Sequence, residues 1–159
     1  MSPAHRIPAA ALAGILLLQS AALAADDPSC APVKSILEAA PRSWRAFKTE
    51  EYSTQFESWQ SRQTLPSYES CWVDDVANRY WCLFRAPSIE AAGKAAAAQA
   101  ETIERCWPGI PTQQAIESGD NNVTRLIQDW TLSSERRLRL VHRKPTQGPG
   151  LSSVFFYVY

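Results

Sequence analysis

Histidine is scarce in this chain, and the common catalytic signatures are missing. Only His5 and His142 occur among the 159 residues. The sequence contains no G-x-S-x-G, no H-E-x-x-H and no phosphate-binding glycine loop, which mark serine hydrolases, zinc proteases and nucleotide-binding enzymes. It also has no C-x-x-C pair, so a structural zinc site is not indicated. Residue types therefore predict no metal, no cofactor and no obvious catalytic centre.

The chain also lacks an excess of charge and a second long apolar run. Sixteen Lys and Arg residues balance sixteen Asp and Glu residues. This balance argues against nucleic acid or an anionic membrane surface as a partner. Beyond the N-terminal segment, no stretch reaches the roughly 18 apolar residues that a membrane span needs. We therefore expect no nucleic-acid partner and no membrane span.

The first 24 residues have the layout of a secretory signal peptide. His5 and Arg6 give a basic start, residues 9–18 form a short apolar run, and Ala22-Leu23-Ala24 provides a small-x-small cleavage site. The sequence predicts a Sec-type signal peptide over 1–24 and a soluble mature chain over 25–159. We expect this chain to be periplasmic or secreted and, at its length, to form a single α+β domain.

Four cysteines remain after the predicted cleavage: Cys30, Cys71, Cys82 and Cys106. An even number behind an export signal predicts two disulfides. If residues 71–74 and 79–82 pair antiparallel around a turn, Cys71 faces Cys82. That register favours Cys71–Cys82 together with Cys30–Cys106. The alternative is Cys82–Cys106 with Cys30–Cys71, in which the helix after Cys82 returns its end to the same strand.

Capping residues and periodicity predict two helices. The first covers residues 32–40, with Pro32 in its first turn and Pro41 after its end. The second is long and Ala-rich, from Ile89 to about Cys106, with Ser88 as its N-cap. Its apolar seam consists mostly of small residues, which would let it lie close to a sheet.

Alternating and apolar segments predict the strands. The candidates are residues 44–48, 51–59, 71–74, 79–85, 124–132, 136–143 and 151–159. Residues 110–122 are polar and are expected to form a connection. The order of elements predicts an α+β fold. Its antiparallel sheet has about five to six strands, the two helices pack on one face, and two disulfides stabilise it.

Aromatic and basic residues mark a candidate binding surface. Trp72 and Trp81 should share the face opposite Cys71 and Cys82, and both faces of the last strand are apolar or aromatic. The second face is thus either buried or exposed for a partner. Arginines on one side of the preceding strand indicate a solvated face or recognition of an acidic partner. The partner-binding candidates are Trp72, Trp81, Tyr157, Tyr159, Arg137, Arg139 and Arg143.

Three functional hypotheses follow. The first is an exported, disulfide-stabilised small binding protein without catalytic activity, an inhibitor- or immunity-like module that binds another protein of the envelope or secreted fraction. The second is a small envelope-acting hydrolase or transferase that uses His142, although a histidine without a visible nucleophile is more often structural. The third is a structural homodimer joined through the aromatic face or the last strand.

Overall fold

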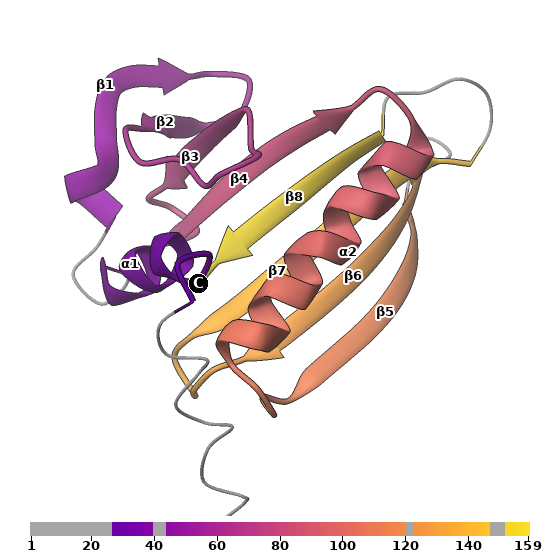
Figure 1. Cartoon of the computed structure of the whole chain (residues 1–159). Coiled ribbons are helices and arrows are strands. Elements are labelled where there is room, and N and C mark those ends of the chain that lie inside the picture. The colour runs from indigo at the N-terminus through magenta and orange to yellow at the C-terminus, as the bar shows by residue number, and fades with distance from the viewer. Residues whose placement is uncertain (1–26, 40–43, 120–122, 147–151) are drawn as a thin grey trace, which may run out of the picture.

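The computed structural model describes residues 27–39, 44–119, 123–146 and 152–159. The predicted signal peptide lies outside these residues. The helices are α1 (Ala31–Ala39), the 3-10 helix η2 (Trp44–Phe47) and α2 (Ile89–Cys106). The strands are β1 (Lys48–Ser53), β2 (Ser58–Ser61), β3 (Ser70–Asp74), β4 (Arg79–Ala86), β5 (Thr112–Gly119), β6 (Val123–Thr131), β7 (Arg137–Pro145) and β8 (Ser152–Val158). Figure 1 shows their arrangement.

The strands form one antiparallel sheet of order β1-β2-β3-β4-β8-β7-β6-β5. The chain runs twice through one helix and four strands, from α1 to β4 and from α2 to β8, with η2 as an addition in the first pass. The last strands of the two passes, β4 and β8, pair in the middle of the sheet. We call the two passes the N-terminal half and the C-terminal half.

The sheet has eight strands, more than the five to six expected. β5 lies in the segment predicted to be a connection. Its residues 112–118 are all exposed, so it shows no alternation of apolar and polar residues. Residues 44–47, predicted as part of a strand, form η2, and the predicted strand 51–59 is divided by a turn at 54–57. Glu57 closes that turn in the left-handed backbone region, with a φ of 48°.

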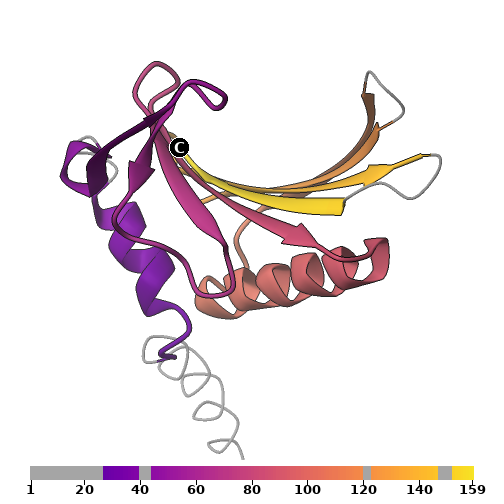
Figure 2. The same ribbon diagram turned by 90° about the horizontal axis from the view of Figure 1, so that it is seen from above.

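Helix α2 has the predicted bounds and packs on one face of the sheet, against β4, β8 and β7 (Figure 2). The Ser88 side chain accepts a hydrogen bond from the Ala91 N–H at 3.1 Å, which satisfies one of the free amides at the helix start. Ile103 of α2, Ile36 of α1 and the strand residues beneath them belong to one buried core. The α+β fold with an antiparallel sheet is thus confirmed.

Both disulfides connect segments that the fold brings together. Cys71 and Cys82 lie directly opposite in the β3–β4 pair, and their Cα atoms are 4.0 Å apart. Cys30 and Cys106 join the start of α1 to the end of α2, with Cα atoms 5.5 Å apart. This is the connectivity that the hairpin register favours.

The last strand offers no open edge. β8 pairs with β4 on one side and with β7 on the other. A homodimer that pairs through this strand would have to break one of these ladders. The edges of the described sheet are β1 and β5.

Candidate functional site

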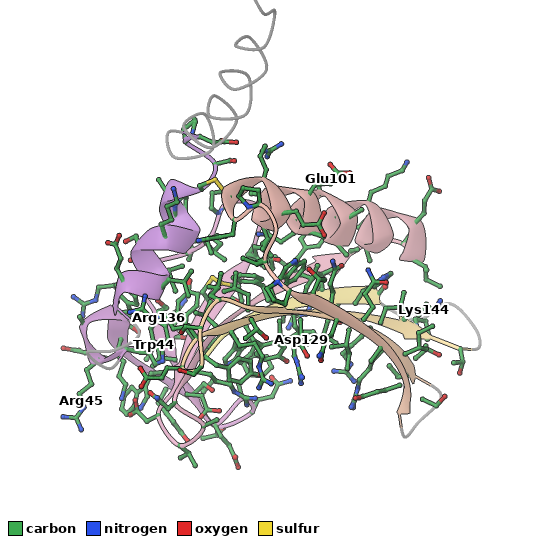
Figure 3. The ribbon with its side chains drawn as sticks, turned by 90° about the horizontal axis from the view of Figure 1, so that it is seen from below. Trp44, Arg45, Glu101, Asp129, Arg136 and Lys144 are labelled. Carbon is green, nitrogen blue, oxygen red and sulfur yellow. A yellow bond between two sulfur atoms is a disulfide. The ribbon has the colours of Figure 1, made fainter. Side chains whose placement is uncertain are left out.

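The face of the sheet turned away from α2 brings side chains of four strands into rows, because directly opposite residues of a ladder point to the same side. From β4 to β6, the central rows are Trp81–Tyr157–Arg139–Asp129, Leu83–Phe155–Val141–Ile127 and Arg85–Ser153–Arg143–Arg125. Figure 3 shows Asp129 on the side of the sheet away from α2. We call this surface the free face.

Trp72 and Trp81 form a packed cluster at the β3–β4 side of the free face. Their rings stack with centroids 6.1 Å apart, and Phe56 from the β1–β2 turn contacts both rings. Only 7% of Trp72 and 5% of Trp81 is exposed. Their indole N–H groups donate to Ser70 Oγ at 3.1 Å and Ser58 Oγ at 3.3 Å. At the β3–β4 side, the aromatic side chains of the free face are therefore buried and not exposed for a partner.

On the free face, Phe155 and Tyr157 of β8 and the following Tyr159 are only half-buried, and arginines lie over them. The guanidinium carbons are 5.5 Å from the ring centroid in Arg79–Tyr157, 4.9 Å in Arg137–Tyr159 and 5.6 Å in Arg143–Phe155. Such cation–π contacts stabilise by about 0.5–1 kcal/mol each at exposed sites. Each contact keeps an arginine close to an aromatic ring of the free face.

A hollow of about 280 Å³ opens on this part of the free face. All five strands from β4 to β5 across the sheet contribute to it. The lining residues are Arg79, Glu117, Arg125, Ile127, Arg139, Val141, Arg143, Tyr157 and Tyr159. Four of them are arginines and only one is acidic, so we call it the arginine hollow.

Two of these arginines are neutralised by carboxylates. Asp129 accepts two hydrogen bonds from Arg139, at 2.7 and 2.8 Å. This bidentate contact raises the pKa of Arg139 above its ordinary value, and burial opposes it only in part. Arg79 lies 2.9 Å from Asp74, its partner across the β3–β4 turn. These two pairs fix side chains at the border of the hollow.

Arg125 and Arg143 are neutralised much less. They lie directly opposite each other in the β6–β7 ladder, where like charges destabilise a sheet. Glu117 approaches Arg125 only to 4.0 Å. Within the described residues, Arg143 forms no ion pair with a carboxylate. The hollow therefore has an excess of positive charge at this pair, which an anionic group would relieve.

Tyr157 adds a neutral hydrogen-bond donor to the hollow. Burial raises the pKa of its hydroxyl, while the charge of Arg79 acts in the opposite direction. The phenol consequently keeps its proton at neutral pH and can donate it in a hydrogen bond. Guanidinium groups and a phenol together suit a ligand rich in acceptors, such as a carboxylate.

His142 lies on the opposite side of the sheet, beneath α2, and is 7% exposed. Its Nε2 is 3.0 Å from Ser152 Oγ, and the Ser152 hydroxyl donates to the Arg143 carbonyl at 2.8 Å. Nε2 therefore carries the proton and donates to Ser152. Burial and the nearby charge of Lys144 lower the pKa of His142. Since Ser152 is fully buried and gives its proton to the backbone, this pair lacks the arrangement of a base and an accessible nucleophile.

Other site types find no support in the part of the chain that the structure describes. There, no group of three or more His, Cys, Asp and Glu residues could hold a metal ion. The described helices include none that is both long and apolar enough to cross a membrane.

The predicted contact residues thus fall into two groups. Tyr157, Tyr159, Arg139 and Arg143 line the arginine hollow, and Arg137 lies over Tyr159 beside it. Trp72 and Trp81 belong to the buried cluster, against which Tyr157 packs. Sequence reasoning missed Arg79, Arg125 and Glu117. The first two follow from extending the two hairpin registers, whereas Glu117 lies on the unpredicted strand β5.

No family model, no curated protein and no solved structure matches the chain. Function therefore has to follow from the geometry of the site itself.

Proposed function

We propose that the chain is an exported, disulfide-stabilised binding protein that captures an acidic segment of another envelope or secreted protein in the arginine hollow. The observation that carries this proposal is Arg143 directly opposite Arg125, without a carboxylate partner of its own in the described structure, beside half-buried tyrosines. A solvated structural face has no need to place two like charges against each other.

Export is supported by the signal-peptide pattern of residues 1–24 and by the two disulfides, which persist in oxidising compartments. An inhibitor- or immunity-like module that neutralises a secreted or envelope enzyme is the concrete form we propose. The alternative, a hydrolase or transferase that uses His142, receives less support because Ser152, its hydroxyl partner, is fully buried.

Arginine and tyrosine suit this task for separate reasons. The planar guanidinium can form two parallel hydrogen bonds with one carboxylate, and it remains charged at all physiological pH values. Tyrosine adds a rigid apolar ring with a polar end and is enriched among the residues that dominate interface energies. An Asp or Glu of the partner would place its carboxylate between Arg125 and Arg143, while the flanking side chain packs on Tyr157.

A matched pair of variants tests the proposal. Arg143→Gln removes a charge of the hollow, and Arg85→Gln removes one from the same row outside it, where Arg85 contacts Glu69 at 3.2 Å. The probe is a synthetic Asp/Glu-rich peptide, with the corresponding Asn/Gln peptide as control, titrated into the purified chain. We expect the acidic peptide to bind the wild type and Arg85→Gln alike, and Arg143→Gln about tenfold more weakly.

Equal binding of the acidic and the amide peptide, or equal loss in both variants, would contradict the proposal. Binding in the hollow should also weaken as salt is raised, since exposed charges are screened. Affinity capture from the envelope fraction with the same three proteins then identifies the partner. It should be retained by the wild type and Arg85→Gln and lost with Arg143→Gln.

A further inference from the structure

A second site lies on the other side of the sheet, between α2 and the strands that this helix leaves uncovered. The helix packs against β4, β8 and β7, so β6 and β5 extend beyond it (Figure 2). The groove at this step has a volume of about 500 Å³, within the usual range of small-molecule pockets. We call it the α2 groove.

The walls of the α2 groove are apolar. On the helix side they are Gly93, Ala96, Ala97 and Ala100, whose small side chains leave the space open. On the sheet side, Leu126 and Ile116 lie in one row with His142. Ile116 is 74% exposed and Ile89, at the helix start, is 44% exposed, and both line the groove. Large apolar side chains around an open groove favour an apolar ligand.

Polar groups are confined to defined places along the groove. Lys144 lies near its end at the first turn of α2 (Figure 3), and the lining includes no carboxylate. His142 is more than nine-tenths buried, and its Nε2 is already paired with Ser152 Oγ. Toward the other end, the Gln128 side chain donates to Glu104 Oε1 at 3.1 Å and bridges β6 to α2. The groove thus has one cationic end and one bridged end.

The length between these ends suits a chain rather than a compact ring. From Lys144 to Leu140, β7 advances four residues, or about 14 Å. From Gly93 to Ala100, α2 advances seven residues, or about 10 Å. An apolar groove of this length with a cation at one end is complementary to a straight aliphatic chain with an anionic head group.

We propose that the α2 groove binds one molecule of a free fatty acid, with the carboxylate at Lys144 and the aliphatic chain along Gly93, Ala96, Ala97 and Ala100. His142 donates from Nε2 to Ser152, which leaves Nδ1 a lone-pair acceptor, so the carboxylate is held by Lys144 alone. This site is independent of the arginine hollow, which lies on the opposite face of the sheet.

The test uses dodecanoate as probe, titrated by calorimetry below its micelle concentration, with dodecylamine and dodecanol as controls. We expect one dodecanoate per chain and affinity about tenfold lower for the amine, because Lys144 attracts one head group and repels the other. Lys144→Gln should abolish the preference for the acid over the alcohol. Equal affinity for acid and amine in the wild type would overturn the proposal.

Two neighbouring helix positions provide a matched steric control. Ala97 and Ala98 are both exposed on α2, but only Ala97 lines this groove. Ala97→Phe should fill the groove and lower dodecanoate affinity about tenfold or more, whereas Ala98→Phe should leave it unchanged. Arg143→Gln should also leave it unchanged, which separates this site from the proposed protein-binding function. Binding to anionic phospholipid vesicles that Ala97→Phe does not weaken would show a membrane surface contact and overturn the proposal.

Discussion

The two halves of the molecule follow the same order of elements but finish the sheet differently. The N-terminal half ends at β1, a strand of 6 residues whose pairing with β2 is interrupted by a register shift. The C-terminal half ends at β5, whose 8 residues pair with β6 in unbroken register. Short and irregular edge strands protect a sheet from further pairing. Only the N-terminal edge has this protection.

The faces of the sheet also differ between the two halves, since the free face is covered in the N-terminal half and open in the C-terminal half. In the N-terminal half, Trp44 and Tyr80 pack on the helix side, and Phe56 covers Trp72 and Trp81 on the other side. In the C-terminal half, the arginine hollow opens on one face, with Arg79 of β4 at its border, and the α2 groove opens on the other. The comparison teaches that one topology can have its free face covered in one half and open in the other, depending on which side chains lie over it.

The largest expected effect concerns the disulfide that joins the halves. Cys30–Cys106 spans 76 residues and Cys71–Cys82 spans 11. Since a longer closed loop restrains the unfolded chain more, the pair Cys30→Ala and Cys106→Ala should lower the free energy of unfolding by about 4 kcal/mol. The pair Cys71→Ala and Cys82→Ala should lower it by about 3 kcal/mol. Urea unfolding of both double variants measures the difference.

A larger loss of unfolding free energy without Cys71–Cys82 than without Cys30–Cys106 would contradict this expectation. The short disulfide would then contribute through native packing inside the N-terminal half rather than through loop closure. The two halves would then differ in a further way, because the N-terminal half would depend on a covalent bond for its packing. Reduction of the wild type with a thiol, followed by the same unfolding measurement, is the control for the effects of the alanines.

Much of the fold could be predicted because several local signals agree. Ser88 marked the start of α2 and the Ala-rich stretch its length, and the antiparallel register of the β3–β4 hairpin predicted the Cys71–Cys82 disulfide. Strand β5 could not be predicted, since an edge strand exposed on both faces has no periodic apolar pattern. The repeated order of elements was also hidden, because α1 has 9 residues and α2 has 18.

The next largest expected effect is a difference in stability between substitutions at the covered end and at the open end of the free face. Trp81 is 5% exposed in the aromatic cluster, so Trp81→Ala should lower the free energy of unfolding by about 3 kcal/mol. Tyr159 is half-buried and lines the arginine hollow, so Tyr159→Ala should lower the free energy of unfolding by less than about 1 kcal/mol. Chemical unfolding checks both values, and peptide titration checks binding.

Tyr159→Ala should weaken binding of the acidic peptide while the protein stays folded. If instead Trp81→Ala left stability unchanged and reduced binding, Trp81 would be a contact residue and the cluster would belong to the open surface. Trp81→Phe, which keeps an aromatic ring in the cluster, serves as the conservative variant and should recover part of the stability.

The side of a strand on which a residue of the candidate site lies could be predicted from the sequence, but the burial of that residue could not. Alternation along β7 predicted that Arg139 and Arg143 share one side, because period-two patterns need only the strand itself. Their position on the same side as Tyr157 follows from the pairing of β7 with β8, which the sequence did not predict. Burial of Trp81 depends on Phe56, which reaches it from a turn 25 residues away in sequence. Coverage by a distant loop leaves no local signal, so the sequence alone could not divide the aromatic residues into buried and exposed ones.

The smallest expected effect is a pH dependence confined to the C-terminal half, which contains the one histidine of the described residues, His142. Burial and the charge of Lys144 lower its pKa in the folded protein below the ordinary value of 6.5. The unfolded chain therefore binds this proton more readily than the folded chain. The stabilisation is complete above pH 6.5 and is lost progressively as the pH falls from there through the folded-state pKa.

His142→Gln tests whether His142 causes the loss of stability at low pH, because the Gln amide can still donate to Ser152 Oγ but does not titrate. Between pH 7 and pH 5, the wild type should lose more unfolding free energy than the variant. Hydrogen exchange should place the loss in β7 and β8, where His142 and Ser152 lie, and leave β3 unchanged. If β3 opened equally, acid would act on the whole sheet, and the two halves would form one cooperative unit despite their different coverage.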